Sequence, residues 1–182
     1  TLDFDALKAD MHALMTDSAS AGTAFACGIK TMSGVIGMDD TKTISYKSIA
    51  QLAEEQGKKV GIISSVSLDH ATPASFYASV ASRGLMNNIA TQMVAADYDF
   101  FGGGGLVAPT AAATSGDTAN NVWTLLADGG YTVLNSRDAI MGLKTNPKSK
   151  VVCINPYLQD ASAMPYAIDQ PATNVSLAEM TE

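Results

Sequence analysis

Four short runs with strand character, separated by helical patterns, constrain most strongly what this chain can fold into. We predict strands at residues 60–63, 97–101, 131–134 and 151–154. The first and last runs are almost continuously apolar, as is typical of parallel strands that are covered on both faces. Strands that alternate with helices predict an α/β fold, in which a mostly parallel sheet is flanked by helices that make right-handed crossovers.

Helical patterns fill the intervals between these strands. Gly57 is a suitable residue to end one helix, and Pro73 fits the first turn of the next. Residues 1–15 have the apolar spacing of a short amphipathic helix, or form an irregular lead-in. The predicted helices span residues 18–30, from 45 or 48 to 57, 73–83, 87–96, 117–127 and 136–141, and a last helix begins at 176.

Four consecutive glycines, residues 102–105, follow the second predicted strand. A dinucleotide-binding loop needs the pattern G-x-G-x-x-G opening directly into a helix. Here residues 106–116 are instead rich in Pro, Ala and Ser. We therefore interpret the glycines as a flexible exit turn and not as a nucleotide-binding loop.

Length and composition exclude several classes of protein. The chain has 182 residues, of which 47% are hydrophobic and 16% charged, so residues 1–182 can bury one sizeable core as a single α/β segment. A net charge of −7 argues against sequence-independent nucleic-acid binding, which needs clustered Lys and Arg. No apolar run approaches the roughly 18 residues that span a bilayer, so we expect no transmembrane segment.

Two cysteines, Cys27 and Cys153, are too few for a disulfide scaffold or a cysteine-rich zinc site. Both have apolar neighbours in the sequence, which favours buried free thiols. The alternative is a disulfide between Cys27 and Cys153.

The chemistry of the chain centres on Ser18, which directly precedes a run of small residues. Small side chains on the first turns of a helix let a backbone or an anion approach its unpaired N–H groups, which suit a phosphate. On this interpretation Ser18 is a nucleophile. The alternative is that Asp17 or Ser18 merely caps a helix that packs closely against a sheet.

Three blocks of sequence resemble one known family. Residues 17–24 (Asp-Ser-Ala-Ser-Ala-Gly-Thr-Ala) and 28–31 (Gly-Ile-Lys-Thr) resemble the phosphoserine signature of alkaline phosphatases. Residues 70–74 (His-Ala-Thr-Pro-Ala) and the later pair 82–83 (Ser-Arg) resemble the block that supplies a magnesium ligand and a phosphate-binding arginine. Residues 101–105 resemble the later strand and its glycine-rich turn.

The resemblance implies a role for each matched side chain. Ser18 would attack phosphorus, carry the phosphoryl group and be activated by zinc as a metal ligand. Arg83 would bind two phosphoryl oxygens, and Asp17 would orient its guanidinium group. Thr72 would be a magnesium ligand. His70 stands where some members carry aspartate and others histidine, and it would bind a magnesium-bound water, tune the neighbouring metal, or position its loop.

Other metal ligands of the family have no counterpart in this sequence. Its upstream metal-binding aspartate would precede Thr1, and its later metal ligands would follow Glu182. Because His12 and His70 are the only histidines, a pair of zinc sites cannot be assembled from histidines here. We therefore expect an incomplete segment of a longer alkaline phosphatase that is inactive, or nearly so, by itself.

The resemblance also implies a phosphate monoester substrate, zinc and magnesium as cofactors, a homodimer, and a periplasmic or secreted location with the signal peptide outside this chain. Thr16 and Ser20 occupy the glycine positions of the G-x-S-x-G elbow, which argues against an α/β-hydrolase triad. Two alternatives remain open. In the first, the chain would be a non-catalytic α/β domain that binds an anion or a partner surface. In the second, it would belong to a related metallo-phosphodiesterase.

Overall fold

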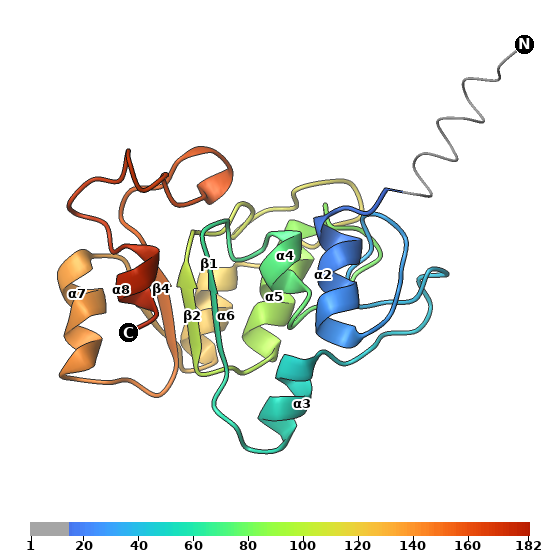
Figure 1. The fold of residues 1–182 in the computed structure, drawn as a ribbon, viewed down its shortest axis with the longest axis horizontal. Helices are drawn as coiled ribbons and strands as arrows, with labels where there is room; N and C mark the ends of the chain where they lie inside the picture. Colours follow the sequence, from blue (N-terminus) through green and yellow to red (C-terminus); the bar gives the residue numbers. More distant parts are fainter. Residues whose placement is uncertain (1–14) are drawn as a thin grey trace, which may run out of the picture.

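A four-stranded parallel sheet forms the centre of the protein (Figure 1). The computed structural model describes residues 15–182. All neighbouring strands run parallel, so the predicted α/β sheet is confirmed. In order across the sheet, the strands are β1 (Gly61–Ser64), β2 (Phe100–Gly103), β4 (Val151–Ile154) and β3 (Thr132–Leu134).

Helices cover both faces of this sheet (Figure 1). Successive residues of a strand point to opposite faces: Val152 of β4 joins the core cluster that contains Ile89, whereas Val151 joins the cluster that contains Ile140. Within residues 15–182, each predicted helical region contains a helix, although several bounds differ. The helices are α2 (Ser18–Cys27), α3 (Ile49–Glu55), α4 (Ala71–Ala74), α5 (Met86–Ala95), α6 (Val122–Asp128), α7 (Arg137–Met141) and α8 (Leu177–Met180), with 3-10 turns at Gly142–Lys144 and Asp160–Ser162.

An aromatic cluster around Phe101 connects the sheet to the loop between β1 and α4. Phe101 is fully buried, stacks on Tyr98 at a centroid distance of 5.8 Å and meets the edge of Tyr77 at 5.6 Å. The Tyr77 hydroxyl donates a hydrogen bond to the Leu68 carbonyl. Each aromatic pair adds about 0.5–1.5 kcal/mol beyond its buried area, so the loop that ends at His70 is anchored to the core.

Helix α2 is shorter than predicted but has the close packing that its small residues suggest. It ends at Cys27, and Gly28 adopts a left-handed conformation with φ 73°, which glycine accepts without steric cost. A Cβ atom on Gly22 would lie 2.4 Å from the Ser75 hydroxyl. Glycine at this position therefore permits the close approach of α2 to the end of α4.

The glycine run is only partly the flexible turn that we predicted. Gly102 and Gly103 belong to β2, and only Gly104 and Gly105 follow it. Gly103 has φ 130°, and a Cβ atom there would lie 1.8 Å from the Ser64 carbonyl oxygen. Gly103 thus permits close contact with β1, and a Cβ atom on Gly102 would lie 2.8 Å from the Met180 sulfur. Both glycines belong to the strand, so the prediction of a flexible turn is wrong for them.

The helix predicted over 73–83 is wrong beyond its first turn. Helix α4 ends at Ala74, and the chain then forms an antiparallel bridge between Val80 and Ile36. The Val80 N–H donates to the Ile36 carbonyl at 2.9 Å, and the Ile36 N–H donates to the Val80 carbonyl at 3.0 Å. A pairing partner distant in the sequence overrides the local helical pattern here.

Two other elements begin later than predicted. Strand β2 begins at Phe100 because Asp97 has a φ of 61°, which an extended strand cannot include. Helix α6 begins at Val122, since the Asp117 carboxylate accepts a hydrogen bond from the Asn87 N–H of α5 instead of starting a helix of its own. The lead-in predicted over residues 1–15 lies almost entirely outside the described residues.

Both cysteines are free thiols. Cys153 is buried, as predicted, and burial raises its pKa to about 12. Cys27 is only half-buried, so the prediction of a buried thiol is wrong for this residue. None of the helices in residues 15–182 combines the length and hydrophobicity that crossing a bilayer requires.

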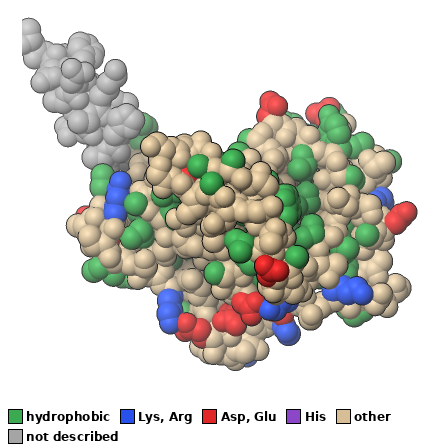
Figure 2. All heavy atoms as spheres, turned by 180° about the vertical axis from the view of Figure 1, so that it is seen from behind, with side chains coloured by type: hydrophobic (Ala, Val, Ile, Leu, Met, Phe, Trp, Pro, Cys, Tyr) green, Lys and Arg blue, Asp and Glu red, His purple; other side chains and the backbone are tan. Residues whose placement is uncertain are grey.

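Charged side chains on the surface tend to lie beside partners of opposite charge. Lys59 pairs with Asp99 at 2.5 Å, and Lys150 pairs with Asp97. On the face shown in Figure 2, acidic and basic side chains lie next to one another along the lower edge. Exposed pairs of this kind contribute little to stability, about 0–1 kcal/mol each.

Candidate functional site

Ser18 is the first residue of α2, but Asp17 is the residue that caps the helix. The Asp17 carboxylate accepts a hydrogen bond from the Ser20 N–H at 3.0 Å, and the Ser20 hydroxyl accepts one from the Asp17 N–H at 3.1 Å. This reciprocal arrangement is a capping box. Because Asp17 closes the helix, the Ser18 hydroxyl is not required for capping.

The Asp17 carboxylate joins three segments of the chain. Its Oδ1 accepts hydrogen bonds from the Ser20 hydroxyl at 2.9 Å and the Gly34 N–H at 3.0 Å, and its Oδ2 accepts one from Arg83 Nη1 at 3.0 Å. Partial burial would raise the pKa of Asp17, but hydrogen bonds from Ser20, Gly34 and Arg83 outweigh it and hold that pKa well below its usual range. Asp17 is therefore an ionised anchor and a poor proton acceptor.

The Arg83 guanidinium lies between Asp17 and His70. Its Nη1 donates to Asp17, while its Nη2 is 3.0 Å from His70 Nε2. The Arg83 backbone N–H also donates to the Gly34 carbonyl at 2.7 Å. The side chain is 32% exposed, so solvent and solutes can still reach it.

His70 caps α4, since its Nδ1 accepts a hydrogen bond from the Thr72 N–H at 3.2 Å. Burial lowers the pKa of His70, the charge of Arg83 lowers it further, and Asp17 opposes both effects. Arg83 has only donors, so its contact with His70 is a hydrogen bond in the tautomer whose Nε2 accepts, whereas the Thr72 contact needs an accepting Nδ1. A neutral imidazole has one acceptor nitrogen, so the Thr72 N–H and the Arg83 guanidinium compete for it.

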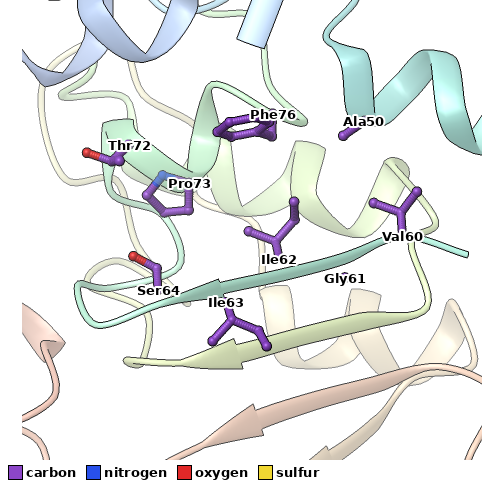
Figure 3. Close-up of a pocket in the computed structure, with 9 residues that line it drawn as sticks. All are labelled: Ala50, Val60, Gly61, Ile62, Ile63, Ser64, Thr72, Pro73 and Phe76. Atoms are coloured by element: carbon purple, nitrogen blue, oxygen red, sulfur yellow. The ribbon is translucent and has the colours of Figure 1, made fainter. Parts of the chain in front are cut away.

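An apolar cavity of about 340 Å³ lies between the edge strand β1 and the helices that cover it (Figure 3). Figure 3 shows Thr72 and Ser64 at one end of this cavity and Ala50 and Val60 at the other. Ser18, Asp17 and Arg83 do not line it. The cavity therefore adjoins the candidate site through Thr72 and is not itself the site.

The described residues supply individual metal donors but not a complete metal site. Among residues 15–182, no group of three or more His, Cys, Asp or Glu side chains could hold a metal ion. The hydroxyl oxygens of Ser18 and Thr72 are suitable donor types for zinc and magnesium, respectively, and His70 Nε2 faces Arg83. His12 lies outside the described residues.

Gly34, Ser20 and Asp69 lie in or near this region but were not predicted as functional residues. Gly34 was recognised only as part of a loop, because its contacts use backbone atoms that no side-chain motif reveals. Ser20 had a usable signal, since Asp17 followed three residues later by a hydroxyl is compatible with a capping box. Asp69 is fully buried, burial raises its pKa, and its Oδ2 accepts from the Val107 N–H at 2.8 Å.

The sequence is similar to alkaline phosphatases from bacteria and vertebrates. The alkaline phosphatase family profile matches residues 5–182. Alkaline phosphatase 4 of Bacillus subtilis is 43% identical over 76 residues, which are 42% of this chain and 16% of that protein. The tissue-nonspecific alkaline phosphatase of Gallus gallus is 36% identical over 81 residues, 40% of this chain and 16% of that protein.

Solved structures give the same result for the fold. Alkaline phosphatase from the Antarctic bacterium TAB5 superposes with a TM-score of 0.68 at 36% identity, covering 82% of this chain and 41% of that chain. The Thermus thermophilus enzyme gives a TM-score of 0.72 at 28% identity, covering 91% of this chain and 34% of that chain. A histidine-to-glutamate variant of the TAB5 enzyme, which has magnesium bound in its M3 site, gives a TM-score of 0.63 at 34% identity, covering 82% and 40%.

This chain thus spans less than half the length of each of these relatives. The family profile nevertheless extends over almost all of its residues, and the parallel sheet agrees with the solved structures. The chain belongs to the alkaline phosphatase family.

Proposed function

We propose that the full-length protein containing this chain hydrolyses phosphate monoesters through a covalent phosphoserine at Ser18. The observation that carries the proposal is the Asp17–Arg83 ion pair at 3.0 Å. Asp17 directly precedes Ser18, so this pair places a guanidinium group beside the first turn of α2. The pair supports the proposal because a nucleophile candidate, helix N–H groups and a cation suited to phosphate would then share one site.

In the first half-reaction, Ser18 Oγ would form a bond to phosphorus while the bond from phosphorus to the ester oxygen breaks and the alcohol leaves. Arg83 would bind two non-bridging oxygens and stabilise the charge of the transition state. Water would then attack phosphorus, release inorganic phosphate and restore Ser18. His70, whose Nε2 lies 3.0 Å from Arg83 Nη2, would help to orient the guanidinium.

The Ser18 hydroxyl must lose its proton, and Asp17 is a poor acceptor because its pKa is held low. Zinc at Ser18 would favour the alkoxide, and magnesium near Thr72 would add positive charge. We propose both metals for the full-length protein, on the family assignment and on the suitable hydroxyl donors. Since residues 15–182 do not contain a complete ligand set, we assign no catalytic step to a metal.

The direct test is hydrolysis of p-nitrophenyl phosphate by the full-length protein, with and without a chelator, combined with mass spectrometry of Ser18. We expect chelator-sensitive turnover and phosphate on Ser18. Ser18→Ala should abolish both, whereas Ser149→Ala, which changes an exposed serine, should abolish neither. The 182-residue chain alone should be inactive; zinc-dependent turnover by it that Ser18→Ala removes would contradict this.

A second candidate function uses the same geometry without covalent chemistry. The partly exposed Arg83 guanidinium, paired with the residue that caps α2, favours an anion-binding α/β domain. That function predicts phosphate binding that survives Ser18→Ala and no phosphoserine. A metallo-phosphodiesterase would instead prefer bis(p-nitrophenyl) phosphate to p-nitrophenyl phosphate.

Family membership also leads us to propose a periplasmic or secreted location and a homodimer for the full-length protein. Cell fractionation of the native host tests the location. Light scattering during size-exclusion chromatography tests the oligomeric state, with a twofold subunit mass as the expected result.

A further inference from the structure

The Asp17–Arg83 ion pair is itself held in place by two residues, Ser20 and Gly34. Asp17 Oδ1 accepts hydrogen bonds from the Ser20 N–H at 3.0 Å, the Ser20 hydroxyl at 2.9 Å and the Gly34 N–H at 3.0 Å. Oδ2 is left to face Arg83. With three donors on one oxygen, the carboxylate cannot rotate freely, so the direction of its second oxygen is fixed.

Ser20 makes this arrangement from inside the protein. It is only 4% exposed, and its hydroxyl also accepts from the Asp17 N–H at 3.1 Å. The Thr16 hydroxyl lies 2.6 Å from the Ser20 hydroxyl and donates to it, because the single Ser20 hydroxyl proton is directed to Asp17. Helix capping needs one acceptor for one N–H, so the second contact from the Ser20 hydroxyl to Oδ1 exceeds what capping requires.

Gly34 contacts both members of the ion pair with its backbone. Its N–H donates to Asp17, and its carbonyl accepts from the Arg83 N–H at 2.7 Å. It has φ 82°, and a Cβ atom there would meet nothing within 4 Å. The left-handed backbone conformation, and not a lack of space, therefore favours glycine here. This conformation directs the N–H towards Asp17 and the carbonyl towards Arg83.

We propose that Ser20 and Gly34 are positioning residues, which fix the Asp17 carboxylate and thereby hold the Arg83 guanidinium in the orientation that binds a phosphoryl group. The inference rests on the proposed function of Arg83. A long arginine side chain that is one-third exposed loses considerable freedom when it binds a ligand, and a fixed orientation reduces that loss. Ser20 and Gly34 touch no substrate in this scheme and act only through Asp17.

The test compares Ser20→Ala and Gly34→Ala with matched variants in the full-length protein. Gly116→Ala is the control for Gly34→Ala, because Gly116 has φ 83° and equally open surroundings. Ser48→Ala is the control for Ser20→Ala, because Ser48 is also buried and belongs to the capping box of α3. We expect the two positioning variants to weaken inhibition by inorganic phosphate, and to lower kcat/KM, about tenfold, as loss of one charge-assisted hydrogen bond would. The controls should stay within about twofold of the wild type.

A double-mutant cycle separates positioning from general structural damage. If Ser20 acts through Arg83, Ser20→Ala should change kcat/KM little in an Arg83→Ala background. An undiminished tenfold loss in that background would overturn the proposal, as would equal losses in the glycine or serine control.

NMR, which does not need an active protein, distinguishes failure of the positioning inference from failure of the proposed function. In the wild type, the Arg83 guanidinium NMR signals should be resolved because the group is held, and in Ser20→Ala and Gly34→Ala they should average. Signals that stay resolved in both variants would overturn the positioning inference. An inactive wild type with resolved Arg83 signals would instead overturn the proposed function and leave the structural part of the inference standing.

Discussion

The guanidinium of Arg83 donates a hydrogen bond at 3.0 Å to Asp17, the residue directly before Ser18. The two residues are far apart in the sequence, and the Val80–Ile36 bridge brings the segment that precedes Arg83 towards the loop after α2. The environment of Ser18 therefore depends on tertiary structure as well as on the helix that begins there.

Replacing Arg83 by lysine should impair phosphate binding although the positive charge is kept. Lysine lacks the planar fork that binds two oxygens and cannot contact Asp17 and His70 in the same way. We expect inhibition by inorganic phosphate and kcat/KM to weaken roughly 10- to 100-fold. Arg137→Lys is the matched control, since Arg137 pairs with Glu179 outside the candidate site; an equal loss there would refute the assignment.

The Arg137–Glu179 pair predicts a specific response to acid. The Glu179 carboxylate accepts a hydrogen bond from Arg137 and further hydrogen bonds from Ser176. These lower the pKa of Glu179 from 4.5 to about 2. A folded-state pKa below the unfolded value means that the stabilisation is fully present above pH 4.5 and is lost as the pH falls through about 2. In urea unfolding, Glu179→Gln should therefore be less stable than the wild type at pH 6, and the difference should shrink as the pH approaches 2. A difference that grows on acidification would contradict the pair's role.

Cys27 and Cys153 should react with iodoacetamide in a fixed order. Burial raises the pKa of Cys153 to about 12 and also raises the pKa of Cys27, but Cys27 is only half-buried. Because the exposed thiolate is the reactive form, mass spectrometry at pH 8 should show Cys27 labelled first and Cys153 labelled only after unfolding in urea. Labelling of Cys153 first in the native protein would show that β4 is less well packed than the structure indicates.

Gly103→Ala should destabilise the protein far more than Gly57→Ala. Both glycines have positive φ, 130° and 71°, but a Cβ atom on Gly103 would lie 1.8 Å from the Ser64 carbonyl, whereas one on Gly57 would meet nothing within 4 Å. We expect a cost of about 1 kcal/mol for Gly57→Ala, and about 3 kcal/mol or more, or failure to fold, for Gly103→Ala. Equal costs in thermal or urea unfolding would show that β2 can move away from β1.

The strands of the sheet were easier to predict from the sequence than the segments that connect the helices. Strand β4 was predicted with its observed bounds. Its four consecutive apolar residues are typical of a parallel strand that is buried on both faces. The helix over 73–83 was wrong since local periodicity contains no information about the bridge from Val80 to Ile36. The same limit applies to Gly103, whose close contact is with Ser64 of β1, and to the approach of Met180 to Gly102.

For the candidate site, side-chain types were predictable and backbone contacts were not. Ser18, Asp17 and Arg83 were named from motif resemblance, and the structure brings Asp17, Arg83 and His70 together, while their catalytic roles remain predictions. Gly34 carries no chemical group that a motif could identify. Its importance arises from a left-handed backbone conformation, which is visible only once the chain is folded.

The phosphoserine mechanism is tested most directly by intact-protein and peptide mass spectrometry of the full-length protein, quenched in acid during turnover of p-nitrophenyl phosphate. We expect one added phosphoryl group on Ser18 in the wild type and none in Ser18→Ala. Chelator-sensitive hydrolysis by a folded, zinc-loaded protein that continues in Ser18→Ala, or a phosphoryl group on a different residue, would contradict it.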